Sequence, residues 1–135
     1  MRVRTWQLVG FAVALWTAAA AAHHSFAAHF VVDRLITVRG NVDEFTFRNP
    51  HGVLKLTAKN DEGVEQQWKI ETNSPNILRR RGWTATSIKA GDVVKVEGYP
   101  SRDGSNSMRV YRVTYDDGRE LVGQRPDPNL VSGDD

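Results

Sequence analysis

A change of hydrophobic period in the middle of the chain restricts its fold more than any other feature. Residues 53–58 alternate apolar and polar side chains, which is the pattern of a half-buried β-strand, and similar segments occur on both sides of the midpoint. Residues 74–82, between the two groups of strand-like segments, carry the signals of a short helix. Ser74 suits the N-cap, Pro75 the first helical position and Gly82 the position after the last turn. The sequence therefore predicts a β-rich chain with one short helix.

The strand-like segments have a definite order around this helix. Three precede it and two follow it, with a shorter segment near residue 120. This order predicts a small OB-like barrel of five strands, in which the helix connects the third strand to the fourth. An SH3-like barrel and an open β-sandwich are the alternatives. The predicted strands are residues 36–47, 53–58, 64–70, 93–99 and 108–115.

The first of these strands is expected to be long and bent. Its apolar residues lie at even positions up to Val42 and at odd positions from Phe45 onward. Such a change of phase indicates a β-bulge, and Gly40 is expected to permit the bend. Further apolar residues are expected to face the barrel interior from the third strand and from the helix. These residues are Val64, Trp68, Ile70, Ile77, Leu78 and Trp83.

The N-terminus has the order of a secretory signal peptide. Arginines among the first four residues precede an apolar run over residues 8–16 and then five alanines that end at Ala22. This order predicts a signal peptide over residues 1–22 with cleavage after Ala22. The apolar run is shorter than the roughly 20 residues that cross a bilayer, and a retained anchor is the alternative. The mature chain then divides into an N-terminal arm (23–34), the barrel (35–122) and a disordered tail (123–135).

Composition narrows the classes of function. The chain has 18 basic and 16 acidic residues, and two of the basic residues, Arg2 and Arg4, lie in the predicted leader. The mature protein is therefore formally neutral, which argues against a nucleic-acid partner, since phosphate-binding surfaces need excess Lys and Arg. The absence of cysteine excludes disulfides, thiolate metal sites and cysteine catalysis.

The histidines are distributed unevenly. Three of the four, His23, His24 and His29, lie within the first seven residues of the predicted mature chain, and His51 follows Pro50. Cleavage after Ala22 would give His23 a free α-amine, which can chelate one ion together with its own imidazole. Nitrogen ligands in a tetragonal arrangement suit Cu(II). The alternative is a flexible polar N-terminus that binds metal only incidentally.

Other candidate groups have ordinary structural explanations. The arginines at 79–81 can grip an anion, although a solvated helix face is the more common role of such a run. Trp68, Trp83, Tyr99 and Tyr111 can form a stacking surface for a sugar or base, but core packing explains both tryptophans better. No nucleophile elbow, phosphate-binding glycine loop or His-Glu-x-x-His helix motif occurs in the sequence.

Four stretches of the mature chain are informative together. They are residues 23–28 (His-His-Ser-Phe-Ala-Ala), 49–51 (Asn-Pro-His), 74–83 (from Ser-Pro-Asn to Arg-Gly-Trp) and 91–105 (from Gly-Asp through Gly-Tyr-Pro to Asp-Gly-Ser). The combination resembles a family of small secreted proteins of proteobacteria that has no assigned function. The resemblance covers nearly all of residues 23–122. It implies a Gram-negative periplasmic location and cleavage just before His23, and it implies no activity.

The resemblance also bears on the metal ligands. It implies that most relatives carry an acidic residue where this chain has His29, which leaves His23, His24 and His51 as the expected ligands. We therefore expect a periplasmic, non-enzymatic barrel that binds copper or another divalent ion through these histidines, with no nucleic acid and no stable membrane anchor after cleavage. One alternative is a metal-free binding module for a protein or an envelope glycan. The other is a copper-dependent oxidative enzyme.

Overall fold

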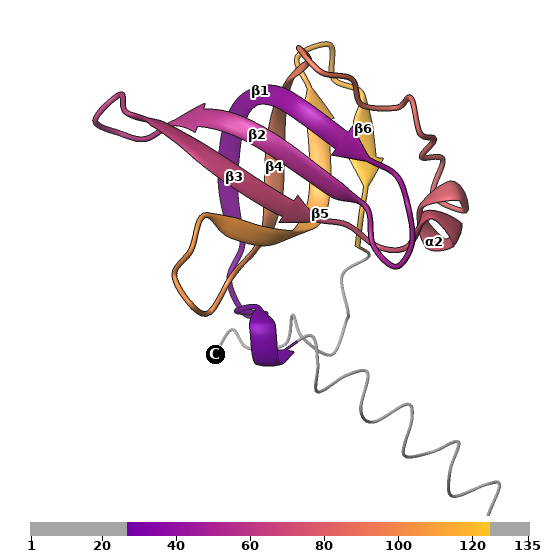
Figure 1. Ribbon diagram of the computed structural model, residues 1–135, viewed down its shortest axis with the longest axis horizontal. Coiled ribbons are helices and arrows are strands. Elements are labelled where there is room, and N and C mark those ends of the chain that lie inside the picture. Colours follow the sequence, from indigo (N-terminus) through magenta and orange to yellow (C-terminus); the bar gives the residue numbers. More distant parts are fainter. Residues whose placement is uncertain (1–26, 125–135) are drawn as a thin grey trace, which may run out of the picture.

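The strands and the helix follow the predicted order. The computed structural model describes residues 27–124, and Figure 1 shows their arrangement. The predicted signal peptide, the residues His23 and His24 and the tail from residue 125 onward lie outside this range. The elements are β1 (Ile36–Thr46), β2 (Val53–Lys59), β3 (Glu65–Glu71), α2 (Pro75–Arg79), β4 (Val93–Pro100), β5 (Ser107–Tyr115) and β6 (Glu120–Val122).

The strands form a closed barrel with one additional strand. The sheet order is β3-β2-β1-β4-β5-β6, and a further pairing between β3 and β5 closes the first five strands on themselves. Every pairing is antiparallel except the closing one, which is parallel and joins residues 69–71 to residues 107–109. Because α2 connects β3 to β4, the predicted OB-like barrel with one short helix is confirmed.

Strand β1 is long and bent, as predicted, but its bulge is not at Gly40. The first half of β1 pairs with β4 and the second half with β2, and the register shifts between Val42 and Glu44. Gly40 has a different role, because a Cβ atom there would lie 2.5 Å from the backbone oxygen of Thr57. The glycine therefore permits close approach of β1 and β2, while the bulge at Asp43 changes the phase.

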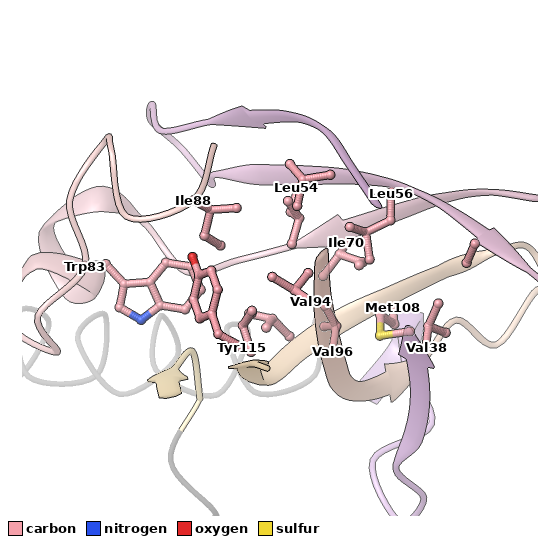
Figure 2. Close-up of a cluster of buried hydrophobic side chains, with 14 of the residues drawn as sticks. Val38, Leu54, Leu56, Ile70, Trp83, Ile88, Val94, Val96, Met108 and Tyr115 are labelled. Carbon is pink, nitrogen blue, oxygen red and sulfur yellow. The ribbon is translucent and has the colours of Figure 1, made fainter. Parts of the chain in front are cut away.

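Side chains from all five barrel strands fill the interior. Figure 2 shows these side chains between the strands, with Trp83 at one end of the cluster and Met108 toward the other. Trp83 is 1% exposed, and its indole Nε1 donates a hydrogen bond to the Val122 carbonyl oxygen at 2.9 Å. The fully buried aliphatic members of the core are Leu54, Leu56, Ile70, Leu78, Val94, Val96, Val110 and Val113.

Three of the predicted core residues are placed differently. Ile77 is 40% exposed, because α2 has only five residues and turns Leu78 rather than Ile77 toward the barrel. Val64 is 55% exposed and precedes β3, in the hairpin turn. Trp68 is partly buried and packs against the edge of the core. Apolar residue type and spacing therefore did not by themselves decide which of these positions are buried.

The start of α2 also differs from the prediction. Ser74 occupies the N-cap position, but its side chain makes no capping hydrogen bond. After β6, Gly123 and Gln124 both donate backbone hydrogen bonds to the Tyr111 carbonyl oxygen, so the chain stays attached to β5 up to residue 124. Among the described residues, no helix is long and apolar enough to cross a membrane.

Candidate functional site

The described part of the N-terminal arm is attached to the loop between β4 and β5. Residues 27–29 form a helical turn, which Figure 1 shows below the barrel. Phe30 is 7% exposed and forms an isolated β-bridge with Ser101, while the Val31 N–H donates to the Pro100 carbonyl oxygen at 2.9 Å. Phe30 therefore pins the arm to the barrel.

Arg102 fixes the helical turn of the arm. Its side-chain Nε donates to the Ala27 carbonyl oxygen at 2.6 Å, and its backbone N–H donates to the His29 carbonyl oxygen at 2.9 Å. Two hydrogen bonds from one residue hold both ends of the turn, so the backbone of His29 is placed by the loop between β4 and β5. A segment that carries histidines is thus anchored to the barrel.

The backbone around His51 is placed with similar firmness. His51 lies in the loop between β1 and β2, and the next residue, Gly52, exchanges backbone hydrogen bonds with the end of β3: the Thr72 N–H donates to the Gly52 carbonyl oxygen, and the Gly52 N–H donates to the Asn73 carbonyl oxygen. A Cβ atom at Gly52 would lie 2.5 Å from Thr72 Oγ1. Glycine at 52 therefore permits the contact that holds His51 at this end of the barrel.

A polar cavity of about 740 Å³ lies between these segments. Only one of its eleven lining residues, Phe30, is apolar, so the cavity suits a polar or charged ligand. His29 and His51 both line it, and both are exposed. The other lining residues are Lys69, Glu71, Ser101, Asp103, Ser105, Asn106, Ser107 and Arg109.

Two carboxylates line the cavity. Glu71 ends β3 and forms an ion pair with Lys69, with Oε1 and Nζ 3.5 Å apart. Asp103 lies in the loop between β4 and β5, where hydrogen bonds from the side chain and the backbone N–H of Ser105 and from the side chain of Ser101 lower its pKa to about 2. Asp103 is therefore ionised at any physiological pH.

Arg109 brings a buried positive charge to the same cavity. Its side chain is 8% exposed, and Nη2 donates a hydrogen bond to Asn73 Oδ1. Burial lowers the pKa of Arg109, the nearby Glu71 carboxylate raises it, and the guanidinium of Arg81 lowers it. The group remains a cation, since arginine side chains stay protonated in proteins.

The described residues do not by themselves form a complete metal site. Within residues 27–124, no group of three His, Cys, Asp or Glu side chains is arranged to hold a metal ion. His29 and His51 supply two imidazoles at one cavity, and any further imidazole must come from outside this range. His23 and His24, which were predicted as ligands, lie there.

The structure brings His29, which the family resemblance disfavours as a ligand, into the same cavity as the predicted ligand His51. Arg109 was missed altogether. Its neighbours Met108 and Val110 are buried on the core face of β5, and alternation therefore places Arg109 on the outer face. Nothing local in the sequence indicates that the outer face is covered at this point.

The fold and the cavity define a class: a small OB-type barrel whose N-terminal arm, two loops and β3–β5 closure surround a polar cavity. The chain belongs to a family of unknown function (DUF6152), whose model matches residues 12–109. The matched range contains every residue that lines the cavity. The expectation of a family without assigned function is confirmed. No curated protein matches the sequence.

Proposed function

We propose that the mature protein is a periplasmic, non-enzymatic domain that binds Cu(II) or another divalent ion at this cavity. One observation carries the proposal: His29 and His51 come from segments far apart in the sequence and line the same cavity. Imidazole is among the most common ligands of copper and zinc. The cavity therefore supplies two ligands of the right chemistry, one from the arm and one from the barrel.

The remaining ligands in this proposal are His23 and His24. The carbonyl oxygen of Ala27 is held by Arg102, so the chain before it starts from a fixed point beside the cavity. At about 3.5 Å per residue, His24 can reach at most ~10 Å from Ala27 and His23 at most ~14 Å. If cleavage occurs after Ala22, the α-amine and imidazole of His23 provide a chelate that His24 and His51 complete.

The charges around the cavity affect a cation in opposite directions. Glu71 and Asp103 favour a bound cation, while Lys69 and Arg109 oppose it. The two carboxylates are therefore additional candidate ligands. Lys69 and Arg109 favour a metal ion that also binds an anionic co-ligand. Strong nitrogen ligation offsets this mixed electrostatic environment, which argues for copper rather than for calcium or magnesium.

The test is a calorimetric titration of Cu(II) into the protein that begins at His23. We expect His51→Ala and His29→Ala each to weaken binding about tenfold, which corresponds to about 1.4 kcal/mol. An added N-terminal alanine keeps every histidine and displaces the amine, so it is the matched control for the amine chelate. An affinity that is unchanged in the His29→Ala/His51→Ala double variant would refute binding at the cavity. A copper affinity that is unchanged by the extra alanine would refute the amine chelate but not binding at the cavity.

A metal-free binding module is the second candidate, because ten of the eleven residues that line the cavity are polar. Such a module would take a polar segment of an envelope protein or glycan directly. Metal content after dialysis separates the two candidates: a metal-binding protein retains stoichiometric copper, and a metal-free module does not. Oxygen consumption with a reductant by the copper-loaded protein would instead indicate the oxidative enzyme.

A further inference from the structure

Arg102 binds two carbonyl oxygens of the arm in two different ways. Its side-chain Nε donates to the Ala27 carbonyl oxygen at 2.6 Å, whereas its backbone N–H donates to the His29 carbonyl oxygen at 2.9 Å. A substitution at position 102 removes the first hydrogen bond and leaves the second, because the second involves only backbone atoms. The contribution of the side chain can therefore be measured separately from that of the backbone.

Both carbonyl groups belong to the last turn of a helical segment. This segment ends at His29, since Phe30 already forms a β-bridge with Ser101. The last four carbonyl groups of a helix lack partners within it, and a cation near that end also interacts favourably with the helix dipole. Arg102 therefore caps the segment, because it donates to two of these carbonyl groups and places its positive charge beside them.

The side chain of Arg102 has this one role among the described residues. Within residues 27–124, the Ala27 carbonyl oxygen is its one hydrogen-bond partner, and Arg102 forms no ion pair there. Hydrogen bonds from a charged donor are stronger than those between neutral groups. Because Arg102 is exposed and lies outside the core, its truncation acts on the arm and leaves the packing of the barrel intact.

The other attachments of the arm lie after His29. Phe30 is 7% exposed, and the Val31 N–H donates a backbone hydrogen bond to the end of β4. These contacts hold the extended part of the arm without help from the Arg102 side chain. The helical end, which brings His29 to the cavity, depends in addition on the cap at Ala27.

We propose that Arg102 is a positioning residue for the metal site, whose side chain orders the helical end of the arm and thereby holds the imidazole of His29 at the cavity. This inference rests on the proposed copper function and adds the residue that prepares one of its ligands. A ligand that is already held in place loses less conformational entropy on binding, so it binds the ion more tightly. Arg102 is not itself a ligand, because a guanidinium has no acceptor.

The charge of Arg102 predicts the opposite effect on copper. Removal of a positive charge near a cation site favours the cation, so charge alone predicts that Arg102→Ala binds copper more tightly. Loss of positioning predicts weaker binding. The sign of the change in affinity therefore separates the two explanations. Arg80→Ala is the matched control, since it removes one exposed arginine that does not line the cavity.

The first measurement needs no metal. It records ¹H–¹⁵N heteronuclear NOEs, which report backbone order, on the ¹⁵N-labelled protein that begins at His23 after treatment with a chelator. In Arg102→Ala we expect the NOE of the His29 amide to fall and that of Val31 to stay unchanged, because backbone hydrogen bonds hold Val31. Arg80→Ala should change neither value. An unchanged His29 NOE in Arg102→Ala would overturn the proposal.

The second measurement is a calorimetric titration with Cu(II). We expect Arg102→Ala to weaken binding about threefold or more and Arg80→Ala to leave it unchanged. In the His29→Ala background, Arg102→Ala should have no further effect, because its action passes through His29. Unchanged or tighter binding by Arg102→Ala, or equal weakening in both backgrounds, would overturn the role of Arg102 and leave the copper proposal intact. Absence of copper binding by the unmodified protein would overturn both.

Discussion

Replacing Trp83 with alanine removes the largest fully buried side chain of the described domain. Its ring lies against Phe45, with the ring centroids 5.9 Å apart, and its Nε1 holds the Val122 carbonyl oxygen of the short strand β6. The substitution leaves a cavity and also releases this hydrogen bond. Both effects act at the place where the end of α2 and strand β6 meet the core.

The expected cost follows from these contacts. Large-to-small replacement of a buried Trp costs about 3–5 kcal/mol, because the lost burial is joined by a cavity that relaxes only partly. Trp83→Phe keeps most of the ring and loses the donor, and an intermediate cost of about 1–2 kcal/mol is expected. Trp68→Ala is the matched control, since Trp68 is only partly buried. We expect it to cost less than Trp83→Ala, although periodicity alone predicted equal burial.

The assay is urea unfolding followed by circular dichroism, with free energies compared at equal m-values. The mature protein retains two tryptophans, because Trp6 and Trp16 lie in the predicted leader, so each alanine variant leaves one tryptophan as a fluorescent reporter. In Trp68→Ala, the remaining Trp83 should emit at the short wavelength of a buried indole. A Trp83→Ala cost below that of Trp68→Ala, or solvent-exposed emission from Trp83 in the native state, would show the core assignment to be wrong.

Four further outcomes can be measured. Gly40→Ala should destabilise the barrel by about 1–3 kcal/mol in the same urea assay, since its Cβ would lie 2.5 Å from the Thr57 backbone oxygen; no loss would mean that β1 and β2 can separate freely. The pKa of Asp103 is lowered from 3.8 to about 2, so its charge contributes stability above about pH 4 that is lost as the pH falls toward 2. The difference in unfolding free energy between the protein and Asp103→Asn should therefore shrink across that interval, and a constant difference would contradict this prediction. N-terminal sequencing of the exported protein should give a sequence that begins at His23, and a sequence that begins at Met1 would support the retained anchor. The affinity for copper should fall below about pH 6, because the amine and the imidazole must lose protons to bind the metal.

Local information was enough to predict most of the architecture. Alternating apolar residues predicted strands β1, β2, β4 and β5. Ser74 and Pro75 at its start and Gly82 after its end predicted the helix. These signals act over a few residues, since a strand or a helical turn buries one face by its own period. The order of the segments then predicted the barrel, because a closed arrangement removes most sheet edges.

Local signals fail where a neighbour from elsewhere in the chain decides burial. Ile77 and Val64 have the residue type of a core position, yet Ile77 lies in the middle of α2, Val64 lies just before β3, and both are exposed. Arg109 is the reverse case, a charged residue that is buried because β3 pairs in parallel with β5 at that point. Such burial depends on pairing between distant segments.

The candidate site divides in the same way. The sequence by itself determined the residue types: histidines near the predicted mature N-terminus, one more after Pro50, and no cysteine. The tertiary structure decided which of them meet, because Arg102 holds the arm at the loop between β4 and β5, and Gly52 holds the loop of His51 against the end of β3. The physical reason is that the lining residues come from four segments that are far apart in the sequence, so no local hydrophobic period can predict that they meet. The pairing of β3 with β5 is one of the long-range contacts that bring these segments together.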